Sequence, residues 1–469
     1  MPLKDKNQSD EEKILNPDRE ISEFGQSKSH GHSVRLIVRN VLVLAAVLHV
    51  LSYFTWPLKV RNTLTYEERA LKILSENPLI DGHNDLLILL RGRYQNHIYG
   101  AAFKDSFENG GLEGHVDIPR IRKGRYGGAF WSAFMPCPRN VTNYDDANYA
   151  WTTKATLEQI DTFNRLSAMY PELFTLAPNA AAAEKAFNEG KLISPIIIEG
   201  LHQIGNSVSF LRLYHRLGVR YATLTWNCHN KYADAALITD LEAGRTTAST
   251  PYWNGLSPAG IQLIKEMNRL GMIVDLAHVS KDTMIDVLGG NPEKTNGSLA
   301  PPIFSHSSAY SVCPHPRNVQ DDVLDLVKKR NSLVMVNFSP DFVACKASNS
   351  SDGLPTADPE NATLDQVVKH IMHIGERIGY DHVGIGTDYD GIESTPKGLE
   401  DVSKFPDLVA ALLRAGVSDS DAAKVVGWNM LRVWHEVDRV AHQLRDTLPL
   451  EDDIVPWLQS AVDANKSEL

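Results

Sequence analysis

Polar residues of the kinds that bind metal ions stand at the ends of several short apolar runs in this sequence. His83 and Asp85 follow the run at 78–82, and both can reach one ion because side chains alternate along an extended chain. Further apolar runs end in Glu199, His278, His306 and Asp388. Three imidazoles and several carboxylates suit zinc or another borderline divalent ion. The sequence therefore predicts a metal site assembled from strand ends.

One carboxylate of this set, Glu199, can bridge two metal ions. A two-metal site activates a water held between the ions and polarises a substrate carbonyl, which is hydrolytic chemistry. A lone histidine at a strand end is more often a hydrogen-bonded core residue than a ligand. That alternative is outweighed by five such residues together, which are His83, Asp85, Glu199, His278 and His306. We expect a binuclear centre whose nucleophile is a metal-bridging hydroxide.

Other candidate residues have simpler interpretations. His370 and His373 lie on a charged helical stretch, which predicts a solvated face. His115 and Asp117 repeat the His-x-Asp pattern in a Gly-rich connector, where we expect them to position a loop. His202, just beyond a predicted strand, is a candidate to support the metal ligands.

Arg317 lies in the segment Pro316-Arg-Asn-Val, shortly after the run that ends in His306. A guanidinium group binds a carboxylate through two parallel hydrogen bonds. Arg317 is therefore a candidate anion clamp, and an ordinary surface arginine is the alternative.

The elements that must position these residues are predicted to be buried parallel strands. An unbroken apolar run such as 194–199 is typical of a strand buried on both faces. In a TIM-type barrel, eight such strands alternate with helices, and catalytic residues lie at the strands' C-terminal ends. The fold class predicted is α/β, a (β/α)8 barrel. The eight strands are expected at 78–82, 127–135, 194–200, 221–226, 272–277, 302–305, 332–338 and 382–388.

Length and charge agree with one large domain that does not bind nucleic acid. The chain has 469 residues, of which 43% are hydrophobic, and its net charge is −11. One barrel with elaborations accounts for that length, and the negative charge argues against a polyanion-binding surface. We assign residues 65–445 to the barrel and 446–469 to a C-terminal tail.

The N-terminal region predicts a membrane anchor. Residues 1–40 form a polar, charged tail that we expect to be disordered. Residues 41–58 carry no formal charge and approach the length of a spanning helix. A cleaved signal sequence and a buried helix are the alternatives. Flanking basic residues slightly favour a single-pass topology with a cytoplasmic N-terminus and a luminal or extracellular catalytic domain.

Glycosylation sequons and cysteines also favour a domain outside the cytosol. Four cysteines allow three pairings, and because no pair has Cys-x-x-Cys spacing, structural disulfides are favoured over a zinc knuckle. The cysteines are Cys137, Cys228, Cys313 and Cys345. The sequons are at Asn140, Asn296, Asn349, Asn361 and Asn465.

Several motifs together resemble those of the membrane (renal-type) dipeptidases, zinc peptidases of the amidohydrolase-like barrels. The motifs are DGHND, IEG-x-H, DLAHVS, FSHSSAYSVC, RNVxDDVL, SLVMVNF and GxDxDG, and the likeness covers roughly residues 70–440. It implies two zinc ions, a dipeptide substrate, and internal disulfides Cys137–Cys228 and Cys313–Cys345.

The same resemblance assigns roles within the site. It implies that His83 and Asp85 bind one zinc ion, that His278 and His306 bind the other, and that Glu199 bridges them. Arg317 and Asp388 match residues that contact the substrate, with Arg317 receiving the C-terminal carboxylate and Asp388 transferring the proton.

Two features depart from the family pattern. Relatives are usually secreted or attached through a C-terminal lipid, whereas this chain carries an N-terminal apolar segment and resembles fungal members. Trp226 also stands where the family has a histidine that contacts the substrate, and His229 is three residues away. We therefore expect slower hydrolysis or a narrower pocket.

The predicted function is a membrane-anchored binuclear zinc dipeptidase. Peptides with a D-residue and cyclic amides such as β-lactams are further possible substrates within the class, and a homodimer is an open expectation. The rival hypothesis is a non-catalytic or weakly active surface binding protein that retains the barrel, which the substitution at Trp226 favours and the intact metal positions oppose.

Overall fold

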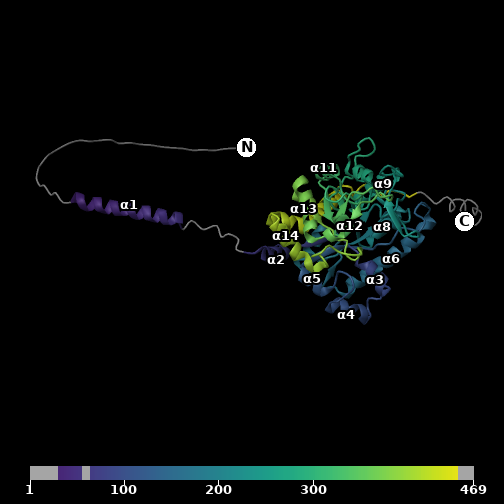
Figure 1. Ribbon diagram of the computed structural model, residues 1–469, viewed down its shortest axis with the longest axis horizontal. Coiled ribbons are helices and arrows are strands. Elements are labelled where there is room, and N and C mark those ends of the chain that lie inside the picture. The colour runs from purple at the N-terminus through teal and green to yellow at the C-terminus, as the bar shows by residue number, and fades with distance from the viewer. Residues whose placement is uncertain (1–29, 55–63, 453–469) are drawn as a thin grey trace, which may run out of the picture. The chain divides into compact units, whose positions relative to one another are not determined.

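The computed structural model describes residues 30–54 and 64–452, which belong to two separate units (Figure 1). The first unit contains one helix, α1 (His30–Phe54). Among the described residues, no helix combines the length and the apolar character needed to cross a membrane. Residues 1–29 of the predicted tail and 55–58 of the predicted anchor lie outside the described residues.

Helix α1 corrects one predicted boundary. Residues 30–40 are helical, although the sequence predicts that the disordered tail extends to residue 40. The segment 33–40 contains no glycine or proline and includes the good helix formers Arg35, Leu36 and Arg39, so nothing in it ends the helix.

All eight predicted barrel strands are present in the second unit, although most are shorter than predicted. They are β1 (Leu79–Asn84), β2 (Tyr126–Ser132), β5 (Ile196–Glu199), β6 (Val219–Thr223), β9 (Ile273–Asp275), β10 (Ile303–Phe304), β11 (Leu333–Val336) and β14 (Val383–Ile385).

These strands pair in parallel in the order β1-β2-β5-β6-β9-β10-β11-β14. A parallel bridge between Asn84 and Tyr389 brings the first strand next to the segment after the last one. The amide of Asp85 donates to the Tyr389 carbonyl (2.8 Å), and the amide of Asp388 donates to the His83 carbonyl (3.1 Å). This is an α/β fold with the strand order of a TIM-type barrel, as predicted.

Short additional strands decorate this sheet. β4 (Leu192–Ile193) pairs with β2, and β3 (Phe174–Thr175) pairs with β4. The predicted long loop 243–260 contains β8 (Arg245–Ala248), which forms an antiparallel hairpin with β7 (Leu237–Asp240). The sequence analysis missed this hairpin.

Helices connect the strands and begin and end at recognisable signals. Thr65 and Glu68 form a capping box at the start of α2. Ser257 caps α9, and Gly271 ends it in the left-handed conformation (φ 76°), as the sequence predicts. The main helices of this unit are α2 (Tyr66–Glu76), α3 (Leu86–Tyr94), α4 (Ala101–Asn109), α5 (Ile118–Gly124), α6 (Asp146–Met169), α7 (Ala180–Asn188), α8 (Val208–Arg216), α9 (Pro258–Leu270), α10 (Lys281–Leu288), α11 (Asp321–Lys329), α12 (Pro340–Val343), α13 (Leu364–Ile378), α14 (Phe405–Arg414), α15 (Asp419–Ala423) and α16 (Asn429–Gln443).

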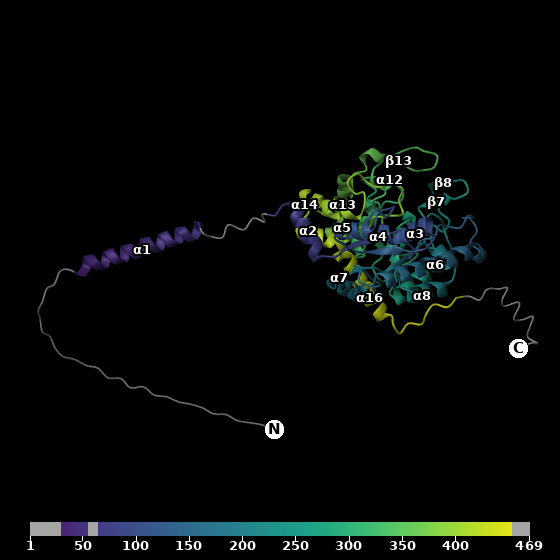
Figure 2. The same ribbon diagram turned by 90° about the horizontal axis from the view of Figure 1, so that it is seen from below.

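The C-terminal helix α16 shares a hydrophobic cluster with alternate residues of the barrel strands. Ile197 and Phe130 belong to this cluster, and Phe130 packs against Trp434 of α16 with ring centroids 5.3 Å apart. Helix α7 lies beside α16 (Figure 2), and Glu184 and His435 form an ion pair between them (2.7 Å). Because side chains alternate along β5, Glu199 projects from the same face of the strand as Ile197.

Both disulfides implied by the resemblance are present. Cys137–Cys228 joins the segment after β2 to the segment after β6, and Cys313–Cys345 joins the segment after β10 to β12 (Cys345–Lys346). The four described sequon asparagines are exposed, as glycosylation would require, and Asn465 lies outside the described residues.

Candidate active site

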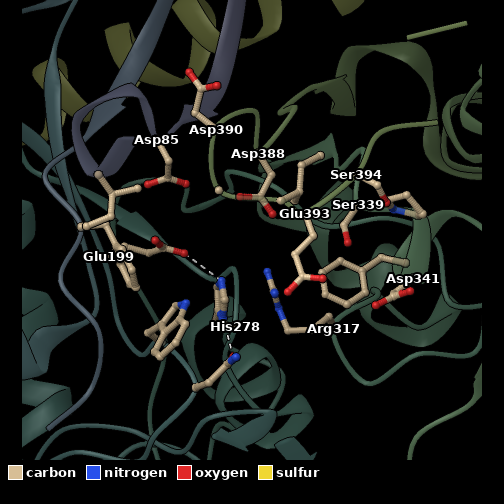
Figure 3. Close-up of a pocket in the computed structure, with 18 residues that line it drawn as sticks. Asp85, Glu199, His278, Arg317, Ser339, Asp341, Asp388, Asp390, Glu393 and Ser394 are labelled. Atoms are coloured by element: carbon tan, nitrogen blue, oxygen red, sulfur yellow. Dashed lines mark hydrogen bonds and ion pairs between the residues drawn. The ribbon is translucent and has the colours of Figure 1, made fainter. Parts of the chain in front are cut away.

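The structure brings the five predicted metal ligands together around the carboxylate of Glu199. Its Oε1 lies 2.9 Å from His278 Nε2 (Figure 3). The same Oε1 lies 3.5 Å from His306 Nε2, and Oε2 lies 3.5 Å from His83 Nε2. Asp85 Oδ2 lies 3.1 Å from His83 Nε2. Each residue stands at or just beyond the C-terminal end of a barrel strand, and one carboxylate therefore touches the Nε2 atoms of three imidazoles.

The other ring nitrogen of each histidine has a hydrogen-bond acceptor. His83 Nδ1 lies 2.8 Å from the hydroxyl of Tyr221, which itself donates to the Gly82 carbonyl (2.9 Å) and so accepts from the histidine. His278 Nδ1 lies 2.8 Å from Asn227 Oδ1. These partners keep the proton on Nδ1 and leave the Nε2 lone pair for a metal.

His306 is oriented by a chain of two hydrogen bonds. Its Nδ1 lies 2.9 Å from the hydroxyl of Ser305, and that hydroxyl donates to Asp275 Oδ2 (2.7 Å). Asp275 is the last residue of β9, so the strand next to β10 sets the orientation of the imidazole. The sequence did not predict these orienting roles, which belong to Tyr221, Asn227, Ser305 and Asp275.

The donor atoms fit a divalent cation. His278 Nε2 and His306 Nε2 lie only 2.9 Å apart, and two lone pairs at that distance repel unless a cation lies beside them. Burial lowers the pKa of both histidines well below the usual range, so both are neutral ligands at pH 7. Asp85 Oδ1 is buried and accepts no hydrogen bond from the described part of the chain. Metal ions beside Asp85 and beside the two histidines would satisfy these atoms.

Burial also raises the pKa of two carboxyl groups of the site. It raises the pKa of Glu199 to about 7 and that of Asp388 to about 6. Asp388 Oδ2 accepts a hydrogen bond from Asn337 Nδ2 (3.0 Å), which fixes its orientation. A carboxyl group whose pKa lies near neutrality suits proton transfer.

Arg317 is a buried cation that contacts no carboxylate in the described part of the chain. Only 2% of the residue is exposed, and burial lowers its pKa to about 10, so it remains charged at pH 7. Nη2 donates to the His306 carbonyl (3.3 Å), while Nε has no partner among the described residues. The guanidinium lies over the Phe342 ring, 4.9 Å from its centroid. A buried cation with unused donors is suited to an anionic ligand.

The candidate metal-binding carboxylates and Arg317 open into one cavity of about 580 Å³. Asp85, Glu199, His278, Arg317 and Asp388 all line it (Figure 3). This volume lies in the usual range for a small-molecule site.

Three of the cavity residues have a strained backbone. His278, Asp388 and Asp390 are in the left-handed region, with φ values of 66°, 65° and 68°. This conformation is costly for residues other than glycine and clusters at functional sites. Here it lets the chain turn sharply just beyond β9 and β14, where each side chain enters the site.

Trp226 and His229 have different locations. Trp226 lines the cavity, and its ring lies 6.2 Å from the His278 ring and 5.0 Å from the Phe134 ring, centroid to centroid. His229 does not line the cavity. Its Nδ1 accepts from the Ala235 amide (3.1 Å) and its Nε2 contacts the Thr250 carbonyl (3.0 Å), so it braces the loop after β6.

The remaining histidine candidates have structural roles, and the predictions for His370 and His202 are wrong. His370 is fully buried rather than solvated, with Nε2 on the Val343 carbonyl (2.8 Å). His373 pairs with Asp321 on the surface (2.8 Å). His202 contacts the Met135 carbonyl (2.8 Å) and none of the metal-binding atoms.

The second His-x-Asp pair positions a loop, as predicted. His115 contacts Asp390 through its backbone and side chain (2.7 and 2.9 Å). Asp117 caps α5 by accepting from the Arg120 amide (2.9 Å).

Comparison with known proteins agrees with this geometry. The dipeptidase aclJ of Aspergillus oryzae (strain ATCC 42149 / RIB 40) is 45% identical over 390 residues, covering 83% of this chain and 85% of that protein. The solved structure of dipeptidase AC, a metallopeptidase of family M19, is 25% identical with a TM-score of 0.63, covering 77% of this chain and 99% of that one.

A metallopeptidase from Rhodobacter sphaeroides, solved with a phosphinate mimic of the dipeptide L-Ala-D-Ala, shares the fold. It is 24% identical with a TM-score of 0.62, over 77% of this chain and 99% of that one. Residues 67–447 match the protein family described as "Membrane dipeptidase (Peptidase family M19)". With its converging imidazoles and carboxylates, this chain belongs to peptidase family M19 and is a metallo-dipeptidase.

Proposed function

We propose that this protein is a binuclear zinc dipeptidase that cleaves the peptide bond of free dipeptides. The observation that carries the proposal is the contact of one carboxylate, Glu199, with the Nε2 atoms of three histidines. His83 and Asp85 would hold one ion, His278 and His306 the other, and Glu199 would bridge them. When bound, zinc acts as a Lewis acid that activates water and polarises the scissile carbonyl.

The chain's own residues position the substrate and move the proton. Arg317 binds the C-terminal carboxylate, because it is a buried cation with unused donors in the same cavity. Asp388, held by Asn337, accepts a proton from the attacking water and returns it to the leaving amine. Because Arg317 binds the C-terminal carboxylate of the substrate, the scissile bond must be the last peptide bond before a free C-terminus.

The test is hydrolysis of a dipeptide panel by the purified full chain, before and after chelation and zinc restoration. We expect activity that disappears with chelator and returns with zinc, and about two zinc ions per chain by elemental analysis. Including L-Ala-D-Ala in the panel tests whether a D-residue is accepted. Hydrolysis that survives complete metal removal would refute the proposal, and so would a zinc-loaded protein that cleaves no dipeptide.

We further propose that the catalytic unit lies outside the cytosol and is anchored through residues 41–58. Two disulfides favour an oxidising compartment, and α1 exposes a row of large apolar side chains between Leu36 and Leu48. The test is membrane fractionation of the full chain with alkaline carbonate. Release of the protein into the soluble fraction would refute the anchor.

A further inference from the structure

One side of the active-site cavity is an apolar wall made by Phe134 and Trp226. Both residues line the cavity and are partly exposed. The Phe134 and Trp226 rings pack against each other, 5.0 Å apart with a tilt of 58°. The wall carries no charged group, and the nearest polar ring is that of His278, 6.2 Å from Trp226.

Covalent and hydrogen-bonded contacts hold this wall in place. The disulfide Cys137–Cys228 joins the two segments that carry Phe134 and Trp226. Buried His202 holds the first segment by contacting the Met135 carbonyl (2.8 Å). A wall fixed before the substrate arrives loses little conformational entropy on binding, so its contacts contribute more of their energy to recognition.

The wall and Arg317 border different parts of the cavity. Arg317 packs against Phe342, whereas Trp226 packs against Phe134 and His278. In Figure 3, His278 lies between Glu199 and Arg317. A dipeptide whose carboxylate binds Arg317 and whose scissile carbonyl lies at Glu199 must extend its N-terminal residue past the metal ligands, away from Arg317. The Phe134–Trp226 wall is the apolar surface available there.

We propose that Phe134 and Trp226 form the subsite for the side chain of the N-terminal residue, and that this subsite selects aromatic and large aliphatic side chains. This inference rests on the proposed function, because it takes its orientation from the Arg317 clamp. The wall buries apolar side chains and offers no hydrogen-bond donor or positive charge to a carboxylate beyond the indole N–H of Trp226, so it attracts apolar side chains and disfavours acidic ones.

The experiment compares kcat/KM for Phe-Ala, Ala-Ala, Glu-Ala and Ala-Phe with the zinc-loaded full chain. In the wild type, Phe-Ala should exceed Ala-Ala by roughly tenfold or more, since even one methylene in an apolar pocket discriminates by about 10-fold or more. Glu-Ala should be slower than Ala-Ala. Trp226→Ala and Phe134→Ala should each lower the ratio of Phe-Ala to Ala-Ala about fivefold or more.

Trp151→Ala is the matched control, because Trp151 is 56% exposed on α6 and does not line the active-site cavity. It should leave the ratio unchanged. Trp226→Phe keeps an aromatic ring and should retain most of the preference, which protects the test if Trp226→Ala fails to fold.

Three results would overturn the inference. The first is equal kcat/KM for Phe-Ala and Ala-Ala in the wild type. The second is a preference that belongs to Ala-Phe and depends on Trp226, which would place the wall at the C-terminal residue. The third is a preference unaffected by the Trp226 and Phe134 variants. In each case dipeptides are still hydrolysed and the proposed function survives, whereas hydrolysis of no dipeptide refutes the proposed function itself.

Discussion

Replacing Glu199 with glutamine should have opposite effects on stability with and without metal. The carboxylate is buried, and burial raises its pKa from 4.5 to about 7. Between these pH values the folded protein holds a proton that the unfolded chain has released, so stability falls as pH rises through this window. At 1.36 kcal/mol per tenfold change, the ionised carboxylate costs roughly 3 kcal/mol at pH 8 in the absence of metal.

Glu199→Gln removes that cost and keeps the shape of the side chain. The chelator-treated variant should therefore be more stable than the chelator-treated wild type at pH 8, by up to about 3 kcal/mol, and nearly equal to it at pH 4.5. With zinc at about 1,000 times the wild-type Kd, the order should reverse. The wild type then gains about 4.1 kcal/mol, which exceeds the roughly 3 kcal/mol cost of the buried carboxylate, whereas the variant has lost the charge that would bridge both ions.

The assay is urea unfolding of wild type and variant at both pH values, with chelator and with zinc, alongside zinc content by elemental analysis. Glu158→Gln is the matched control. Glu158 pairs with Arg91 on the surface (2.8 Å), and such pairs contribute only about 0–1 kcal/mol. Full zinc occupancy in Glu199→Gln, or a metal-free variant no more stable than wild type at pH 8, would refute the reasoning.

Three further variants test other parts of the site and fold. Arg317→Ala should lower kcat/KM for dipeptides roughly 30-fold or more, because losing a buried charged contact costs about 2–5 kcal/mol. If the wild type cleaves a dipeptide and its C-terminal amide at equal rates, Arg317 does not bind the C-terminal carboxylate. Trp226→His should raise turnover of Ala-Ala by supplying a donor to the oxyanion, since loss of such a donor typically lowers turnover by about 10²–10³. His229→Ala should change turnover little. No gain in Trp226→His, beside a loss of more than about tenfold in His229→Ala, would mean that His229 is the donor. Burial lowers the pKa of His370 to about 4, so stability should fall as pH drops from 6.5 toward 4. In urea unfolding, His370→Gln should reduce this fall in the free energy of unfolding. An unchanged dependence on pH would exclude His370 as its cause.

The positions of the candidate metal ligands could be predicted because each depends on a local signal. A run such as Ile196–Ile198 is typical of a strand buried on both faces, and Glu199 follows it directly. In a parallel barrel all strand ends meet at one rim. Knowing which residues end the strands is therefore enough to know which residues meet.

The prediction for His370 was wrong because it followed the charged composition of α13 and not the spacing of the apolar residues in that helix. Lys369, Glu376 and Arg377 give α13 a charged composition, yet His370 is spaced three and four residues from Val367 and Ile374. Both neighbours are buried on the inner face of the helix, and His370 is buried with them. The apolar stripe at i, i+3 and i+4 was the signal that could have placed this histidine correctly.

The residues that orient the metal ligands could not be assigned from the sequence, because each acts on a histidine from another strand or loop. Tyr221 reaches His83 across 138 positions, and Asn227 reaches His278 across 51. Ser305 differs from Tyr221 and Asn227, because it directly precedes the histidine that it orients, His306. Its role nevertheless depends on Asp275, 30 residues earlier on the neighbouring strand.

The left-handed backbone at His278 and Asp388 follows from the same long-range contacts. The His278 carbonyl accepts from the Ala236 amide (2.7 Å), and the Asp388 amide donates to the His83 carbonyl (3.1 Å). Each bond anchors a strained turn to a segment far away in the sequence, which offsets a local cost of about 1–3 kcal/mol. Strand ends thus determine which residues meet, and contacts between distant segments determine how their side chains point. A substitution that weakens such a contact, without touching a ligand, should loosen the metal site before it unfolds the barrel.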